Sequence, residues 1–266
     1  MAKPAERSDG EKEFAFNQRD FDRVRGLIYQ RAGISLSDSK QEMVYSRLAR
    51  RLRATGINSF SVYLDMLERE IGSNEWESFT NALTTNLTSF FREEHHFPIL
   101  AEHVKKKSGP LRVWCSASST GEEPYSIAIC ICEALGTLKP NVEIIATDID
   151  TNVLSVAARG VYNLDRIEKL PNDIVRKYFL KGRGKNEGSV LVRPELRNLI
   201  HFESLNLLED RWALNGEFDV IFCRNVMIYF DKPTQSSILK KFVPLLKSDG
   251  LLFAGHSENL DRKSVV

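Results

Sequence analysis

The sequence predicts an α/β protein built from a small N-terminal helical domain and a doubly wound domain that carries an inserted antiparallel β-subdomain. Three observations predict this arrangement. No β-like run of residues appears before residue 110. From there, β-like runs alternate with helical patterns, which is typical of a mostly parallel sheet covered by helices. One segment, 177–192, breaks the alternation with two β-like runs around a glycine-containing turn.

Four helical patterns account for the first third of the chain. In the first, Phe21, Val24 and Ile28 recur at helical spacing, and Gly33 ends the helix. The other three helices are expected at about 39–54, ended by Gly56, at 59–71, ended by Gly72, and near 74–87, where Trp76, Phe79, Leu83 and Leu87 form one stripe.

The second of these helices is strongly basic. From residue 40 to residue 53 it holds five basic residues and one acid, a local charge of +4, and its apolar residues fall on the opposite side from its arginines. A solvated face of an ordinary amphipathic helix would explain this pattern. Because the acids of this domain lie elsewhere in the sequence, we expect an uncompensated patch that attracts an acidic partner. The residues concerned are Arg47, Arg50, Arg51 and Arg53.

The second part of the chain reads as alternating strands and helices. The expected order is strand 111–116, helix 122–135, strand 142–148, helix 150–159, strand 199–204, strand 217–223, helix 231–247 and strand 250–256.

The turn after the first strand is the most informative local feature. Six small residues, 115–120, lead to Gly121, which permits a sharp turn, and Glu122, Glu123 and Pro124 open the next helix. A helix N-terminus after such a loop usually attracts phosphate. Two carboxylates there would repel it, so a nucleoside with free hydroxyls, or a cation, suits this turn better than a dinucleotide does.

An acid at the end of the next strand supports this interpretation. Asp148 lies 27 residues after Gly121 with one helix between them. An acid in this place typically accepts hydrogen bonds from ribose hydroxyls. A helix cap for 150–159 is the alternative role, and the Gly121 turn favours the ribose role.

Five segments together resemble one known family. They are TNLTSFFRE at 85–93, STGEEPYSIA at 119–128, ATDID at 146–150, FCRNVMIYF at 222–230 and LLFAGHSEN at 251–259. Their order and spread are similar to those of the chemotaxis receptor glutamate methyltransferases, the CheR family. The resemblance implies transfer of a methyl group from S-adenosylmethionine to receptor glutamates, with S-adenosylhomocysteine as the second product and a Rossmann-like methyltransferase domain.

The resemblance also implies a division of the chain. We expect a polar tail at 1–15, a receptor-recognising helical domain at 16–84 and a linker with cofactor residues at 85–93. The methyltransferase domain follows at 94–266, with its β-subdomain near 177–193. In the family this subdomain docks a C-terminal receptor tether, and an exposed edge with Gly182, Gly184 and Gly188 suits strand addition, although a surface loop would also explain the segment.

The expected cofactor residues come from the same segments. Arg92 is expected to pair with the methionyl carboxylate, a geometry that arginine suits, unless its segment is only a helix-capping cluster. Tyr229 is expected to orient the incoming carboxylate or to pack near the methyl group, unless it is a core aromatic beside Phe230. With these two as catalytic residues, the expected cofactor-binding set is Asn86, Thr88, Arg92, Glu123, Asp148, Asn206, Leu207, Arg224 and Asn225.

The expected chemistry needs no general base. An exposed Glu has a reference pKa of about 4.3, so it is already a nucleophile near pH 7. His95, His96 and His103 lie near a predicted helix start. We expect no metal site, because adjacent residues such as His95 and His96 diverge on a helix.

The C-terminus departs from the family pattern. The family usually continues past HSEN into a final pair of antiparallel strands, whereas residues 260–266 end this chain. We therefore expect a sheet without its terminal hairpin, so that this form's stability and activity need testing. A second departure is the run of Ser and Ala at 115–120 where many methyltransferases place an early glycine.

The bulk properties exclude several classes. A chain of 266 residues with a net charge of +1 can bury a substantial core and does not suit whole-surface binding of nucleic acid. The longest apolar run, 127–135, is too short to span a bilayer, and the polar first 13 residues predict no secretory signal. Four cysteines without metal spacing are expected to be reduced thiols. We expect a cytoplasmic monomer whose partners are the methylation helices and C-terminal tether of receptors, with no nucleic acid and no membrane insertion.

Two other functions remain open. One is a methyltransferase for nucleic acids or small molecules on the same fold, which the near-neutral charge and the Val-Met-Ile-Tyr after Asn225 disfavour. The other is a non-catalytic module that senses the cofactor or docks receptors, which the presence of Arg92 and Tyr229 disfavours.

Overall fold

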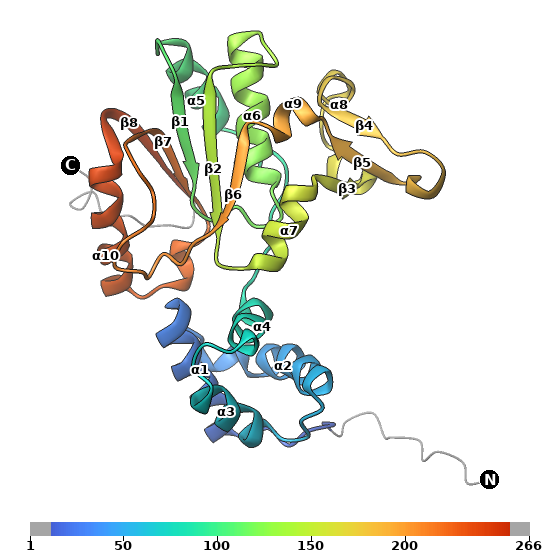
Figure 1. Cartoon of the computed structure of the whole chain (residues 1–266), viewed down its shortest axis with the longest axis vertical. Helices are drawn as coiled ribbons and strands as arrows, with labels where there is room; N and C mark the ends of the chain where they lie inside the picture. The colour runs from blue at the N-terminus through green and yellow to red at the C-terminus, as the bar shows by residue number, and fades with distance from the viewer. Residues whose placement is uncertain (1–11, 256–266) are drawn as a thin grey trace. The chain divides into compact units, whose positions relative to one another are not determined.

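The computed structural model describes residues 12–255 and divides the chain into two compact units, Met1–Thr84 and Thr85–Val266. The four predicted N-terminal helices are present (Figure 1). They are α1 (Gln18–Ala32), α2 (Gln41–Thr55, after a short 3-10 turn at Asp38–Lys40), α3 (Phe60–Arg69) and α4 (Asn74–Leu83). Within 12–255, no helix has the length and apolar character that crossing a membrane requires.

The caps explain where α1 begins and ends. Asn17 accepts from the backbone N–H of Asp20, and Asp20 accepts from the N–H of Asn17, which is a capping box. At the other end Gly33 has φ 68°, the left-handed conformation that ends a helix at low cost to glycine. Between these caps, Phe21, Val24 and Ile28 are fully buried, as their helical spacing predicts.

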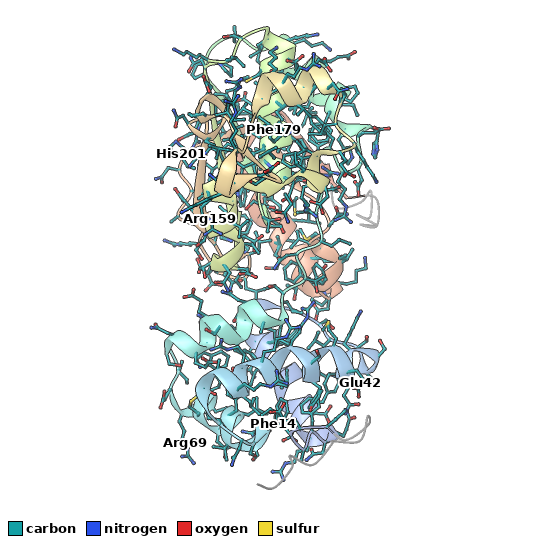
Figure 2. The ribbon with its side chains drawn as sticks, turned by 90° about the vertical axis from the view of Figure 1, so that its right-hand side faces the viewer. Phe14, Glu42, Arg69, Arg159, Phe179 and His201 are labelled. Atoms are coloured by element: carbon teal, nitrogen blue, oxygen red, sulfur yellow. The ribbon has the colours of Figure 1, made fainter. Side chains whose placement is uncertain are left out.

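One expectation about the helices of this unit is wrong. The fourth helix ends at Leu83 because Thr84 is extended, so Leu87 lies off the apolar stripe and is 77% exposed. At the end of the predicted tail, Phe14 packs against Phe60, and just after it the ring centroid of Phe16 lies 4.5 Å from that of Phe60 (Phe14 is labelled in Figure 2). Aromatic packing therefore connects the residues before α1 to α3.

The expectation of an uncompensated arginine patch on α2 is wrong for three of its four residues, Arg47, Arg51 and Arg53. Arg51 makes two hydrogen bonds to Glu75 of α4, at 3.0 and 2.7 Å, and Arg53 pairs with Glu13 at 2.8 Å. Arg47 donates to the carbonyl groups of Ala82, Leu83 and Thr84 at the end of α4. The charge count along α2 missed these partners because they come from elsewhere in the chain.

The larger unit has a five-stranded parallel sheet in the order β6-β2-β1-β7-β8. Its strands are β1 (Leu111–Cys115), β2 (Val142–Asp148), β6 (Ile200–Ser204), β7 (Phe218–Cys223) and β8 (Leu246–Ala254). The connecting helices are α5 (His96–Lys105), α6 (Glu122–Leu135), α7 (Thr151–Arg159) and α10 (Lys232–Phe242). From β1 the chain builds toward β6 and then returns to build toward β8, so the strand order reverses between β1 and β7. Ligands bind outside the carboxyl ends of strands at such a switch point.

Two apolar cores lie on opposite faces of this sheet. Successive strand residues point to opposite faces. Val113 and Cys115 of β1 accordingly join the core that includes α5 and α6, whereas Trp114 joins the core that includes α10. Burial on both faces explains why the central strands are almost continuously apolar.

A second sheet of three antiparallel strands interrupts the alternation, as the hairpin pattern predicts. Its order is β3-β5-β4, formed by β3 (Val161–Asn163), β5 (Ser189–Val192) and β4 (Phe179–Lys181, with Phe179 labelled in Figure 2). The third strand, β3, was not predicted, because three residues are too few to show a period. Two short helices, α8 (Asn172–Tyr178) and α9 (Pro194–Arg197), flank the hairpin in sequence.

The glycines of the hairpin allow the backbone conformation of its turn. An ideal Cβ at Gly182 would lie 1.9 Å from the carbonyl oxygen of Asn186, so the close approach of the turn requires glycine there. Gly184 and Gly188 have open space around them, but their φ values of 59° and 84° favour glycine. Residues 256–266, which hold the predicted C-terminal departure and all of HSEN at 256–259, lie outside the described residues.

Candidate cofactor site at the carboxyl ends of the parallel strands

The loop between β1 and α6 is held close to the sheet. Ser116 and Ser118 are buried, and Gly121 has φ 99°. An ideal Cβ at Gly121 would lie 2.8 Å from both the Cβ of Ala157 and the hydroxyl oxygen of Tyr162. Only glycine therefore fits this turn without displacing its neighbours, and small side chains leave the loop backbone open to a ligand.

Asp148 ends β2 beside this loop. Its Oδ2 accepts from the N–H of Ser119 at 2.8 Å, and its Oδ1 accepts from the N–H of Asp150 at 3.0 Å. Burial raises the pKa of Asp148 to about 6, although these N–H groups oppose the rise. The cap of α7 is Asp150, which accepts from the N–H of Asn152 and Val153. Asp148 thus orders the loop and is not the residue that caps the helix.

The segment 85–93 belongs to the larger unit and crosses this loop. Asn86 donates from Nδ2 to Asp150 at 2.8 Å, and its carbonyl accepts from the hydroxyl of Ser119. Two non-glycine residues, Phe91 and Glu93, both have φ 53°. Left-handed backbone at such residues costs free energy and clusters at functional sites.

Arg224, at the end of β7, joins this segment to α6. Its side chain is fully buried. Nη1 donates to Glu123 at 2.8 Å, Nη2 donates to the carbonyl of Arg92, and Nη2 lies 3.4 Å from Glu93. Asn225, with φ 57°, donates from Nδ2 to the other oxygen of Glu93 at 3.0 Å. The predicted residues Arg92, Glu123, Arg224 and Asn225 are therefore brought together by one buried guanidinium.

A second arginine, Arg166, holds the same region from the side of the small sheet. It lies in the 3-10 turn Leu164–Ile167, directly after β3, and pairs with Glu122, which is 1% exposed. Its Nη2 also donates to the carbonyl of Thr88 at 2.8 Å. In β3, just before this turn, the hydroxyl of Tyr162 donates to the carbonyl of Thr120 at 2.7 Å. The predicted residue Thr88 is thus anchored through its backbone.

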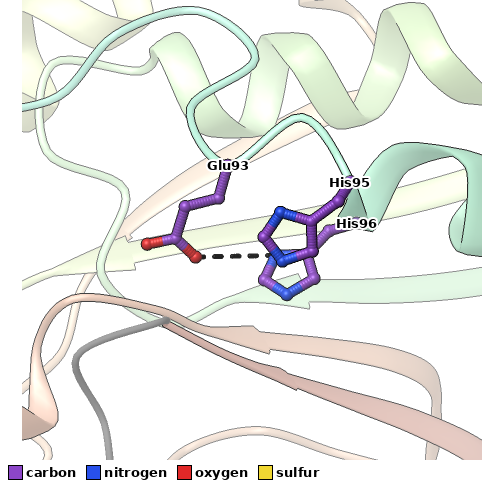
Figure 3. A group of neighbouring side chains, drawn as sticks. All are labelled: Glu93, His95 and His96. Atoms are coloured by element: carbon purple, nitrogen blue, oxygen red, sulfur yellow. Dashed lines mark ion pairs between the residues drawn. The ribbon is translucent and has the colours of Figure 1, made fainter.

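Glu93, His95 and His96 form a group whose potential ligand atoms lie within 4.8 Å of one another (Figure 3). The centroids of the two imidazole rings are 4.2 Å apart, so the expectation that these side chains diverge is wrong. His95 precedes the first helical residue of α5, which explains the difference. Arg224 and the positive end of α5 both lie beside the group and disfavour a cation. We therefore assign Glu93 to Arg224 and Asn225 rather than to a metal ion.

Three other predicted site residues have contacts of their own, outside the hydrogen bonds of Arg224, Arg166 and Asp148 described above. Tyr229 is half-buried in the 3-10 turn Met227–Tyr229, next to the buried Phe230. Leu207 has its side chain in the core and accepts from Lys241 through its carbonyl. The amide oxygen of Asn206 accepts from the N–H of Leu208, which shapes the turn after β6.

The sequence analysis missed the residues that fix the predicted site residues in place through hydrogen bonds and ion pairs. Glu93, Asp150, Tyr162 and Arg166 all belong to this class. Asp150 had a detectable signal, since Asp before Thr-Asn is typical of an N-cap. Arg166 had none, because its partners lie 44 and 78 residues away in the sequence.

Comparison with known proteins covers nearly the whole chain. The profile described as "CheR methyltransferase, all-alpha domain" matches residues 19–84, and "CheR methyltransferase, SAM binding domain" matches residues 86–265. A chemotaxis protein methyltransferase of Salmonella typhimurium is 58% identical over 245 residues, which are 92% of this chain and 85% of that protein. Chemotaxis protein methyltransferase 2 of Pseudomonas aeruginosa is 54% identical over 253 residues, 94% of this chain and 90% of that protein.

Proposed function

The chain belongs to the CheR methyltransferase family, and from this premise we propose that it methylates glutamate side chains of chemotaxis receptors with S-adenosylmethionine. It is a chemotaxis protein methyltransferase with an S-adenosylmethionine-binding domain. The match extends over both the helical domain and the catalytic domain, which favours a receptor enzyme over a general small-molecule methyltransferase.

One observation carries the proposal: four motif segments meet at the carboxyl ends of β1, β2 and β7. Arg224 connects Glu123 with the backbone of Arg92, and Asn86 connects Asp150 with the loop at Ser119. The strand order reverses at this edge, where open α/β sheets bind their ligands.

The side chains at this edge fit S-adenosylmethionine by their chemistry. Asp148 offers a carboxylate for ribose hydroxyls, and Glu123 offers one for the amino group. Arg92 offers a guanidinium for the methionyl carboxylate, and at present it donates to the carbonyl of Leu87 within its own segment. The hydroxyl of Ser118 is buried without a hydrogen-bond partner among residues 12–255 and could donate to a ligand in this loop.

The reaction requires positioning rather than acid–base chemistry. When bound, S-adenosylmethionine supplies an activated methyl group. The substrate glutamate is already ionised near pH 7, so the protein must align its oxygen and exclude water. We assign alignment to Arg92 and Tyr229. Burial and the nearby Arg224 lower the pKa of His96 to about 4, so this imidazole stays neutral at neutral pH and Arg224 carries the local positive charge.

Two surfaces are proposed for the receptor. On α2, Arg50 is exposed, and no ion pair is seen for it among the described residues, which leaves it able to attract the acidic methylation region. On the small sheet, an extended receptor tail would pair with a free strand edge. We favour the outer edge of β4, because β3 leads directly into the turn that contacts the cofactor loop.

The test is transfer of label from S-adenosylmethionine to chemoreceptor membranes. Base-labile label on the receptor is expected, because a glutamate methyl ester hydrolyses readily in base. Arg92→Ala should bind receptor normally and transfer little label. Base-stable label, or label on nucleic acid instead, would overturn the proposal.

A further inference from the structure

We propose that Arg166 is a positioning residue of the cofactor site, and that the small sheet thereby forms part of that site as well as a docking surface. This inference rests on the proposed function, because the residues it positions are those assigned to S-adenosylmethionine. The contacts of Arg166 are with Glu122 and the carbonyl of Thr88, so it would act through other residues.

The first argument for this role is that the buried carboxylate of Glu122 needs a cationic partner. This carboxylate is 1% exposed in the first turn of α6, and its Oε1 pairs with Arg166 while its Oε2 accepts from the hydroxyl of Thr120 at 2.6 Å. A buried carboxylate that loses its cationic partner is strongly destabilising. Among the described residues no second ion pair to Glu122 is seen, so Arg166 supplies its compensation.

The second step is the other hydrogen bond of the same guanidinium. Nη2 of Arg166 donates to the carbonyl of Thr88 at 2.8 Å. Thr88 lies between Asn86 and Arg92, in the segment that crosses the loop at Ser119. Arg166 therefore ties the crossing segment to the first turn of α6, which also carries Glu123.

The third step is the origin of this arginine. Arg166 follows β3 by three residues, and Tyr162 within β3 donates to the carbonyl of Thr120. Phe90 packs edge-on against Tyr162 and Phe179, with ring centroids 5.1 and 5.5 Å apart (Figure 1 shows β3 and β4). Two hydrogen-bonding side chains and one aromatic cluster therefore join the small sheet to the loop and to the segment 85–93.

The experiment separates the two contacts of Arg166. Wild type, Arg166→Ala, Glu122→Gln and the double variant are compared by thermal unfolding and by calorimetric binding of S-adenosylhomocysteine. Arg166→Ala should lower the melting temperature and raise the Kd about tenfold to a hundredfold. In the double variant no uncompensated charge remains, so the melting temperature should recover. The Kd should stay high, because Thr88 still lacks its donor.

A matched control comes from the same subdomain. Arg193 also donates to a backbone carbonyl, that of Arg176, away from the cofactor loop. Arg193→Ala should leave the Kd within twofold of wild type. The inference fails if Arg166→Ala binds as tightly as wild type, or if affinity recovers together with stability in the double variant. If wild type itself does not bind S-adenosylhomocysteine, the proposed function fails first.

Discussion

Arg224 donates a hydrogen bond to Glu123 across 2.8 Å, and this contact joins the end of β7 to the first turn of α6. The guanidinium is fully buried, and its Nε has no hydrogen-bond partner among residues 12–255. A buried ion pair is weak evidence for net stability, because desolvation of both charges opposes their attraction. The contribution of Arg224 is instead to fix the positions of the Glu123 side chain and the Arg92 backbone.

Removal of this guanidinium should be costly. Arg224→Met leaves Glu123 and Glu93 near an apolar side chain, so the free energy of unfolding should fall by about 3–5 kcal/mol. Urea denaturation measures this. Arg25→Met is the control, because Arg25 pairs with Asp38 at 2.7 Å but both side chains are exposed, so its loss should cost about 1 kcal/mol or less. Equal losses in the two variants would contradict the assigned role.

Cofactor affinity should depend on the charge of Asp148. Its pKa in the folded protein is about 6, above the reference of about 3.9, so this group stabilises the cofactor-free fold fully below about pH 4 and loses that contribution as pH rises through 6. Binding to ribose hydroxyls favours the ionised carboxylate. Below pH 6 the Kd should therefore rise by up to about tenfold per pH unit. Calorimetry from pH 5 to 8 measures this, and Asp148→Asn should flatten the profile; a flat wild-type profile would sink the ribose assignment.

A matched pair of glycines tests the turn before α6. Gly121 and Gly109 have nearly the same φ, 99° and 95°, but only Gly121 has atoms where a Cβ would lie. Gly109→Ala should cost about 1 kcal/mol through backbone strain alone. Gly121→Ala should cost about 1–3 kcal/mol more, because the added methyl group meets Ala157 and Tyr162. Chemical denaturation of both variants gives the difference, and similar values would show that Ala157 and Tyr162 simply move aside.

Substitution of Arg51 should lower stability, whereas substitution of the neighbouring Arg50 should weaken receptor docking. Arg51 pairs with Glu75, which also accepts from the hydroxyl of the buried Tyr63 at 2.7 Å. Arg51→Ala should therefore destabilise the helical unit by about 1–3 kcal/mol. Arg50→Ala should leave the melting temperature unchanged and lower the rate of receptor methylation, with an effect that shrinks as salt rises. A salt-independent effect of Arg50→Ala would argue against electrostatic docking.

Backbone pairing on β4 can be tested with proline. Gly182 donates to the carbonyl of Ser189 and Tyr178 accepts from Arg193, so by alternation Phe179 and Lys181 direct their N–H groups away from β5. Lys181→Pro removes an outward donor and should abolish binding of a receptor-tail peptide in fluorescence anisotropy without weakening cofactor binding. Asn163→Pro makes the matching change on β3. Loss of peptide binding in Asn163→Pro alone would place the tail on the other edge.

Local sequence patterns predicted helix and strand boundaries best where a single residue sets the backbone conformation at the boundary. The range 122–135 is helical as expected, since Gly121 and the acids set its start and Gly136, in the left-handed conformation, sets its end. Asp148 and Arg224 lie at strand ends as expected. Their partners could not be predicted, because hydrogen bonds such as Arg224 to Arg92 and Arg166 to Thr88 join residues far apart in sequence. The charge of α2 was misread for the same reason, as Glu13 and Glu75 lie outside that helix.

The hydrogen bond from Tyr162 to the carbonyl of Thr120 bears on how receptor preference could be re-engineered. If the small sheet docks a receptor tail, as we propose, exchange of residues 161–192 for the matching segment of a relative would transfer the docking strand. The incoming segment would also have to bring a phenol and a guanidinium at the positions of Tyr162 and Arg166. Without them, the chimera should bind S-adenosylmethionine more weakly as well as lose its original receptor. With the proposed roles of Tyr162 and Arg166, the small sheet cannot be exchanged on its own. Its strand β3 and the turn after it have to change together with the loop between β1 and α6.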